Sequence, residues 1–218
     1  MNNAMYTDVK THYDKLIDEG NDPVHDSEPL KKYMDKWDGQ LFIDDMQLSG
    51  KEAVLEIGVG TGRLAIKVCE KCREFYGIDI SSKTIEAAKK NLSQYSNVHL
   101  ICHDFLEWKA DAAFDVIYSS LSFLHIKDKE EAIEKTYKLL NKNGRFVLSI
   151  DKSQDGEIVY DTRRIKTYPD NVENIKRLLN GIGFIIKKQY ETEFAYIFVS
   201  VKFQEVSTRY AGESKATK

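Results

Sequence analysis

The sequence has few cysteines, no long apolar run and no excess of basic charge. Its 218 residues include three cysteines and carry a formal net charge of −3. An odd number of cysteines without a recognisable signal sequence favours a reducing, cytoplasmic environment. No stretch reaches the roughly 18 apolar residues that a membrane helix needs, so we expect no membrane association. The net charge gives no overall reason to expect a nucleic-acid partner.

The sequence also lacks the ligand pattern of a metal site. Cys69 and Cys72 form a C-x-x-C pair, but no second pair of this kind and no nearby Cys/His pair completes a zinc tetrad. The two cysteines fall in a segment that we expect to be helical. Side chains three residues apart on a helix are neighbours without any special function. We therefore expect no bound metal.

From Glu52 onwards, short apolar runs alternate with helical patterns. This alternation is typical of a parallel sheet with helices on both faces. Two later runs are joined by a turn so short that they must be antiparallel. Residues 157–168 are expected to form an inserted strand or hairpin. The expected strands are 53–57, 74–78, 98–102, 114–118, 145–150, 184–190 and 194–201, and the expected helices begin near 64, 82, 128 and 171.

The N-terminal region follows a different pattern. Apolar side chains at helical spacing predict one helix from Tyr6 to Ile17 and another from Leu30 to Leu41. We expect residues 5–46 to be a helical lid of the same domain, because about forty residues rarely form an independent core. Residues 47–203 would then be the core of the domain, and the polar segment 204–218 a disordered tail.

A glycine-rich loop carries the strongest functional signal. The buried strand that ends in Glu56 continues into Gly58, Gly60 and Gly62, and a helix follows at Leu64. Glycines allow a sharp turn and let a ligand approach the backbone closely, and the free N–H groups of the helix N-terminus suit an anion. A plain strand-to-helix turn rarely needs three glycines. The spacing also differs from the G-x-G-x-x-G fingerprint of nicotinamide and flavin nucleotide sites.

Acidic residues follow the next two strands of the predicted sheet. Asp79 closes the second strand, 17 residues after Gly62. It would either bind ribose hydroxyls or cap the following helix. Asp104 and Phe105 follow the third strand. They would either hold an adenine ring, through its amino group and its face, or be a solvated acid beside a core aromatic residue.

Together these segments resemble the class I S-adenosylmethionine-dependent methyltransferases. The first motif of that family corresponds to Glu56 through Gly62, the second to Asp79, and the third to Asp104 with Phe105. Residues 114–125 resemble the segment around the family's fourth strand. The acids make the crevice negative, which suits a sulfonium better than a pyrophosphate.

The resemblance covers residues 50–201 and implies both a fold and a cofactor. The fold would be α/β, with a Rossmann-like, doubly wound seven-stranded sheet of order 3-2-1-4-5-7-6 and an antiparallel seventh strand. The cofactor would be S-adenosylmethionine, leaving as S-adenosylhomocysteine. The residues expected to bind it are Glu56, Gly58, Gly60, Gly62, Asp79, Ile80, Asp104, Phe105, Ser119 and Tyr13.

The reaction expected from this cofactor is an in-line displacement that depends mainly on alignment. His125, after the fourth strand, is the candidate general base, with a purely structural role as the alternative. Tyr6, Arg163 and Tyr168 are candidate substrate contacts, because the family varies its substrate contacts in these regions. Tyr6 could instead be core, and Arg163 could lie in a solvated strand. Since Arg163 and Arg164 are adjacent in a strand, at most one faces a given pocket.

The acceptor is expected to be a small molecule. Alternatives are an RNA or protein acceptor, or a binding module that keeps the cofactor site without the chemistry. The sequence shows no basic tail, and Tyr118-Ser119-Ser120-Leu121 stands where amino-directed nucleic-acid methyltransferases carry an N-P-P-Tyr type signature. The complete cofactor set argues against the binding module. The oligomeric state is left open.

Overall fold

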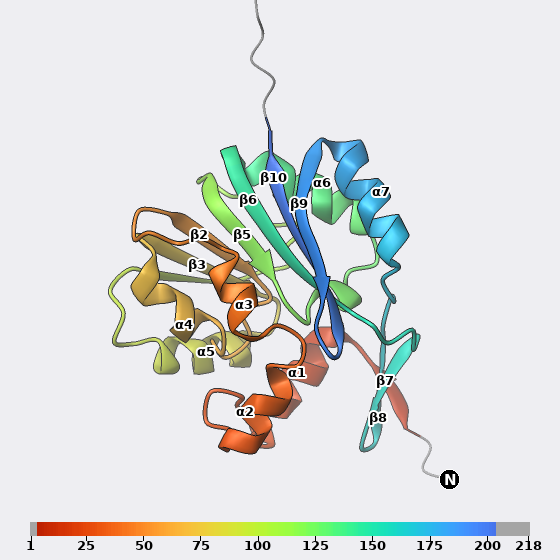
Figure 1. The fold of residues 1–218 in the computed structure, drawn as a ribbon. Coiled ribbons are helices and arrows are strands. Elements are labelled where there is room, and N and C mark those ends of the chain that lie inside the picture. Colours follow the sequence, from red (N-terminus) through yellow and green to blue (C-terminus); the bar gives the residue numbers. More distant parts are fainter. Residues whose placement is uncertain (1–3, 204–218) are drawn as a thin grey trace, which may run out of the picture.

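A seven-stranded sheet forms the centre of the molecule in a computed structural model that describes residues 4–203 (Figure 1). Its order is β4-β3-β2-β5-β6-β10-β9, and only β10 runs antiparallel to its neighbours. This is the expected order 3-2-1-4-5-7-6, so the predicted Rossmann-like α/β fold is confirmed. The strands are β2 Ala53–Ile57, β3 Glu74–Asp79, β4 Val98–Cys102, β5 Phe114–Ser119, β6 Leu140–Asp151, β9 Phe184–Glu191 and β10 Ala195–Lys202.

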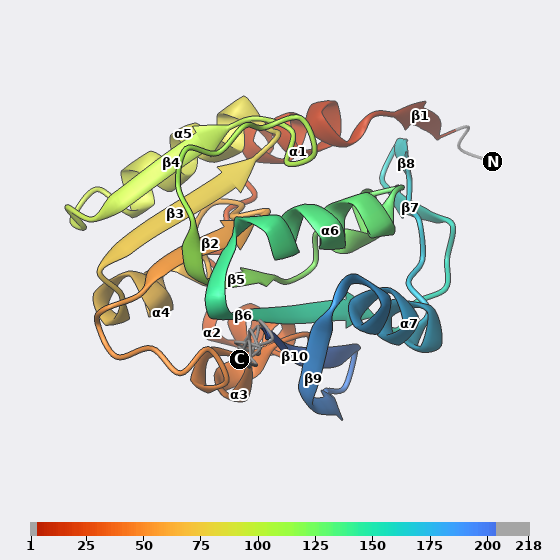
Figure 2. The same cartoon turned by 90° about the horizontal axis from the view of Figure 1, so that it is seen from above.

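Helices cover both faces of this sheet (Figure 2). Because strand side chains alternate between faces, Val54 and Val116 enter one core while Leu55 and Ile117 enter the other. The first core is shared with α3 Gly39–Asp44, α4 Ala65–Val68 and α5 Ser82–Asn91, and the second with α6 Lys129–Leu139 and α7 Val172–Ile182.

A second, three-stranded sheet stands beside the first (Figure 2). The strands β7 Glu157–Tyr160 and β8 Arg163–Lys166 form an antiparallel hairpin, as expected for the inserted segment. The strand β1 Met5–Thr7 pairs with β8 in parallel and leads directly into α1 Val9–Asp18. The insert therefore holds the N-terminal end of α1.

The prediction that the first helix starts at Tyr6 is wrong. The Asp8 side chain accepts a hydrogen bond from the backbone N–H of Thr11 at 2.8 Å and caps the helix, which begins at Val9. Tyr6 lies in β1 instead. Its pairing partner, Arg164, is far away in the sequence, so helical spacing alone could not reveal this strand.

The predicted helix from Leu30 to Leu41 is two helices. The first is α2 Glu28–Met34, and α3 follows only after a break. Gly39 has a φ of 74°, which a continuing right-handed helix does not allow. The break also lets the Trp37 indole donate a hydrogen bond to Asp151 at 2.7 Å.

Two further helix predictions need correction. The helix after the glycine loop ends at Val68, and a 3-10 turn, η1 Cys69–Lys71, follows it. Cys69 and Cys72 are therefore not inside an α-helix, although both thiols are buried and free. The strand expected at Arg145 begins earlier, at Leu140, and the Asn143 turn signal (φ of 61°) lies within this strand.

Among residues 4–203, no helix is both long and apolar enough to cross a membrane. Within the same residues no cluster of histidine, cysteine and acidic side chains suited to a metal ion is found. The segment 204–218, expected to be a disordered tail, lies outside the described residues. The cytoplasmic location stays a prediction.

Candidate active site

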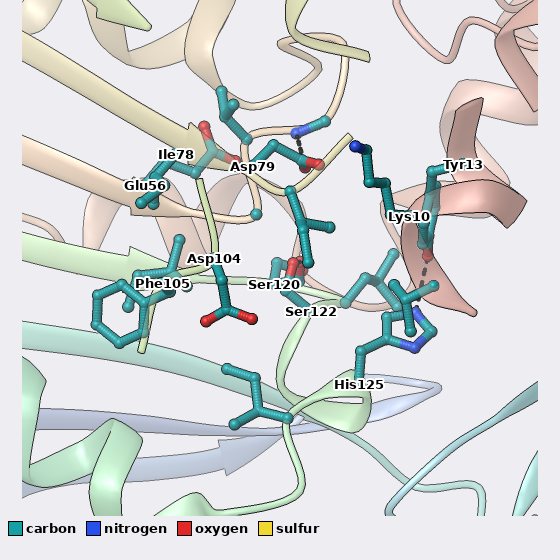
Figure 3. Close-up of a pocket in the computed structure, with 18 of the residues that line it drawn as sticks. Lys10, Tyr13, Glu56, Ile78, Asp79, Asp104, Phe105, Ser120, Ser122 and His125 are labelled. Carbon is teal, nitrogen blue, oxygen red and sulfur yellow. Dashed lines mark hydrogen bonds between the residues drawn. The ribbon is translucent and has the colours of Figure 1, made fainter. Parts of the chain in front are cut away.

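A cavity of about 640 Å³ lies where the central parallel strands end (Figure 3). Its floor is the glycine loop after β2, and the residues that follow β3, β4 and β5 form its sides. Helix α1 contributes Val9, Lys10 and Tyr13 to the wall opposite this floor. Open α/β sheets bind ligands at this edge, and the volume falls within the usual range of about 300–1,000 Å³ for small-molecule sites.

The three glycines of the loop have different roles. All have positive φ, at 77° for Gly58, 56° for Gly60 and 100° for Gly62. A Cβ on Gly58 would lie 1.7 Å from the Ser122 hydroxyl oxygen, and one on Gly62 would lie 3.2 Å from Leu92. A Cβ on Gly60 would meet no atom within 4 Å. Gly58 and Gly62 therefore permit close packing, whereas Gly60 leaves space in the cavity wall.

Asp79 ends β3 with its carboxylate held on both sides. One oxygen accepts from the backbone N–H of Gly60 at 3.1 Å, and the other from the backbone N–H of Ser81 at 2.9 Å. Burial raises the pKa of Asp79, and these bonds to the ionised form oppose that rise. The neighbouring Ile80 also lines the cavity. The fixed carboxylate can still accept further hydrogen bonds from a ligand.

Asp104 and Phe105 form another wall of the cavity. Asp104 Oδ1 accepts from the backbone N–H of Leu106 at 2.7 Å, and Figure 3 shows both carboxylate oxygens beside the open space. The Phe105 ring is largely buried next to them. An acceptor beside a flat apolar ring suits an amino-substituted aromatic base.

Glu56 lies buried at the end of β2. The Tyr118 hydroxyl donates a hydrogen bond to Glu56 Oε2 at 2.7 Å. Burial nevertheless raises the pKa of Glu56 to about 8, because one hydrogen bond does not replace the lost hydration. At neutral pH this carboxyl group is thus mostly protonated, so the crevice is less negative than the sequence indicates. A cationic ligand nearby would favour its ionised form.

An ion pair that the sequence analysis missed closes the cavity on the α3 side. Arg63, directly after Gly62, donates through both terminal nitrogens to Asp38, with Nη1–Oδ1 at 3.1 Å. Ser120 donates to the same carboxylate at 2.8 Å. Asp38 is buried, yet each of its oxygens has two donors, since Gly39 N–H also bonds to it. Arg63 directly after the glycine loop could have been singled out from the sequence, but nothing in the sequence pattern marks Asp38 as its partner.

Tyr13 and His125 meet across the cavity (Figure 3). The Tyr13 oxygen lies 2.9 Å from His125 Nε2, which joins α1 to the turn η2 Phe123–His125. Burial lowers the pKa of His125 to about 4 and raises the pKa of Tyr13. Both groups are therefore neutral at physiological pH, and the histidine tautomer decides whether the phenol or the imidazole is the donor.

Five of the expected site residues do not line the cavity, and one of them is Gly62, which packs against Leu92 instead. Tyr6 is 67% exposed, and its hydroxyl bonds to Glu157 at 2.6 Å. Arg163 is buried in an ion pair with Glu19 at 2.6 and 2.7 Å. The remaining two are held by bonds to main-chain carbonyls: the Ser119 hydroxyl donates to Ile57 at 3.0 Å and the Tyr168 backbone N–H to Leu124 at 2.8 Å.

Comparison with known proteins agrees with this geometry. The family described as "Methyltransferase domain" matches residues 48–198. An uncharacterized methyltransferase of Anoxybacillus flavithermus is 32% identical over 155 residues, which cover 67% of this chain and 71% of that protein.

Solved structures show the same fold. The N-methyltransferase NodS of Bradyrhizobium japonicum, in complex with S-adenosyl-L-homocysteine, has a TM-score of 0.70 at 16% identity and covers 89% of this chain and 98% of its own. Magnesium protoporphyrin IX methyltransferase of Synechocystis, with bound S-adenosylmethionine, has a TM-score of 0.69 at 18% identity, with coverage of 89% and 95%.

Fold, motifs and relatives together define an S-adenosylmethionine-dependent methyltransferase of class I. The chain belongs to the methyltransferase domain family, whose match spans most of the described residues.

Proposed function

We propose that the chain transfers a methyl group from S-adenosylmethionine to a small-molecule acceptor within the cavity under α1. The observation that supports this most strongly is that one cavity brings together two sets of residues. The first set is the glycine loop with Asp79 and Asp104, and the second is the Tyr13–His125 pair.

The residues present fit the cofactor. Gly60 leaves free the space that a Cβ would fill, and the Asp79 carboxylate is already oriented by two backbone donors. Asp79 would accept from the ribose hydroxyls, Asp104 from the adenine amino group, and Phe105 would pack against the base. Once bound, the cofactor supplies an electrophilic methyl group, so that the protein's main task is alignment.

Tyr13 and His125 would hold the acceptor. Neutral His125 can orient an oxygen or nitrogen nucleophile, and it can take a proton only where Nε2 releases Tyr13, because Nδ1 is buried. Tyr13 is fixed by its bond to His125, so its phenol would face the acceptor next to the imidazole. The apolar side chains of Val9, Leu121 and Ile126 line the adjacent surface and would exclude water from the reacting atoms.

The shape of the site favours a small acceptor over RNA or protein. The cavity lies between the sheet and α1, and much of its wall is apolar, including Met34 and Leu64. One solved structure with the same fold is named for a small-molecule acceptor, magnesium protoporphyrin IX. A concave, mostly apolar volume with a few polar groups is typical of small-molecule binding.

Methyl transfer to fractionated cell extract tests this proposal. The purified chain is incubated with S-adenosylmethionine labelled in the methyl group and with three fractions: dialysable molecules, RNA and protein. We expect label in the dialysable fraction, and none there with Asp79→Ala. Label that enters RNA or protein instead would overturn the acceptor class. Binding of S-adenosylhomocysteine without transfer to any fraction would mark the chain as a binding module.

A further inference from the structure

Asp14, a residue with no part in the family motifs, joins helix α1 to the segment that follows Asp79. Asp14 Oδ1 accepts a hydrogen bond from the Ser81 hydroxyl at 2.7 Å and another from the backbone N–H of Lys83 at 3.1 Å. These donors lie at the N-terminus of α5. A carboxylate from the N-terminal region thus completes the capping of a helix in the core.

Ser81 connects this contact to Asp79. Its backbone N–H donates to Asp79 at 2.9 Å, while its hydroxyl donates to Asp14. The side chain of Ser81 is fully buried, and its oxygen also bonds to the Thr84 hydroxyl at 2.6 Å and accepts from the Thr84 backbone N–H at 3.1 Å. One residue therefore carries both the bond that orients the Asp79 carboxylate and the bond that docks α1.

Charge links the same groups. Burial is the main reason that the pKa of Asp79 is raised, and the nearby Asp14 carboxylate adds to the rise. The backbone N–H groups of Ser81, Gly60 and Ile80 lower it, and the titratable side chains that face Asp79 from other elements are Glu56 and Tyr13. The docked position of α1 thus affects the charge of Asp79 as well as its orientation.

We propose that Asp14 is a positioning residue for the cofactor: through Ser81 it fixes Asp79 for the ribose and couples the docking of α1 to cofactor binding. This rests on the proposed role of Asp79. Coupling of this kind is reciprocal, so a bound cofactor also favours the docked helix.

The chain offers a matched control on the same two helices. Asp18 also joins α1 to α5, through the Lys83 ammonium group at 2.6 Å. Both side chains of that pair are largely exposed, and neither bonds to Ser81 or Asp79. Removing Asp18 therefore tests the effect of a lost α1–α5 contact without disturbing Ser81.

Calorimetry with S-adenosylhomocysteine on the full chain tests the proposal. We expect Asp14→Ala to weaken binding about 5- to 20-fold, within the usual range of coupling between sites. Asp14→Asn should bind within about twofold of the wild type, because its amide oxygen can accept both bonds. Asp18→Ala should also stay within about twofold. In an Asp79→Ala background, Asp14→Ala should have little further effect.

A pH series separates positioning from a purely structural role. Asp14→Asn removes the charge and keeps the acceptor, so the pKa of Asp79 falls and binding should be lost at lower pH than in the wild type. A structural contact would leave the pH profile unchanged, and this measurement still decides if Asp14→Ala fails to fold. Wild-type affinity in folded Asp14→Ala, or an unshifted profile in Asp14→Asn, overturns the inference. Failure of the wild type to bind would instead refute the proposed function.

Discussion

At the scale of single residues, the buried acids of the site differ in how well they are compensated. Asp38 receives donors from Arg63, Ser120 and Gly39, whereas Glu56 receives one, from Tyr118. A buried carboxylate with few donors prefers to be protonated. This explains why the pKa of Glu56 is raised to about 8 while the acid lies beside an arginine-containing network.

Glu56 should make the stability of the ligand-free chain depend on pH. Its folded pKa, about 8, lies above the ordinary value of 4.5, so the folded state binds the proton more tightly. This contribution is full below the ordinary pKa and is lost as pH rises towards 8, at up to about 1.4 kcal/mol for each pH unit. Urea unfolding at pH 5 to 8 measures it, and Glu56→Gln should lack this slope. If the free energy of unfolding depended on pH equally in the wild type and in Glu56→Gln, this would contradict the raised pKa of Glu56.

The glycine loop offers a second prediction. Gly60→Ala places a Cβ in open space, so we expect a modest stability cost of about 1–2 kcal/mol from positive φ and a large loss of S-adenosylhomocysteine affinity. Gly62→Ala is strained more, because its φ of 100° lies outside the left-handed region open to L residues, and it also crowds Leu92 at 3.2 Å, so stability should fall further. Thermal unfolding and calorimetry on both variants check this. Unimpaired binding by Gly60→Ala would rule out the proposed approach of the cofactor.

At the scale of elements, the N-terminal region consists of two differently attached parts. Phe42 and Met46, in and after α3, are buried in the core, and the preceding Trp37 is bonded to Asp151. Helix α1 has a single buried residue, His12, and is held mainly by polar contacts such as Asp14 with Ser81. We therefore propose that the lid is β1 with α1, and that α3 belongs permanently to the core.

Hydrogen exchange with and without S-adenosylhomocysteine tests this division. Amides of α1 should exchange faster in the free chain and become protected on binding, because polar contacts at a surface open more easily than a packed core. Amides of α3 should be protected equally in both states and serve as the internal control. Equal protection of α1 in both states would mean that the helix is permanently docked.

The sequence predicts those elements whose signals are local. The strand before Gly58 and the capped helix after Ser81 follow from short patterns of apolar, glycine and capping residues. The position of Tyr6 could not be predicted, because β1 exists only by pairing with β8, more than 150 residues away. The break before α3 was missed for the same reason, since Trp37 in this break bonds to Asp151 on a strand that is distant in the sequence.

The same limit applies to the site. The cavity-lining residues Gly60, Asp79 and Asp104 were predicted because strand ends at one edge of a parallel sheet must face one crevice. The ion pair of Arg163 could not be predicted, because its partner Glu19 follows the last residue of α1. Residues that join the N-terminal region to the core depend on docking, which spacing along the chain does not encode.

At the scale of the whole molecule, the site is divided between two parts of the chain. In the proposed function, the ends of β2, β3 and β4 would supply the cofactor side, and α1 with the turn η2 would supply the acceptor side. The hairpin β7–β8 supports α1 through the bidentate Arg163–Glu19 pair. This arrangement predicts that changes in the insert alter acceptor binding through α1 rather than by direct contact.

Isothermal calorimetry of the purified chain with S-adenosylhomocysteine and, separately, with NADH tests the central claim most directly. We expect saturable binding of S-adenosylhomocysteine and none of NADH. Asp79→Ala should weaken the binding by about 1.5–3 kcal/mol, the usual worth of hydrogen bonds to a charged group. Binding of NADH without binding of S-adenosylhomocysteine, or an unchanged affinity in folded Asp79→Ala, would contradict it.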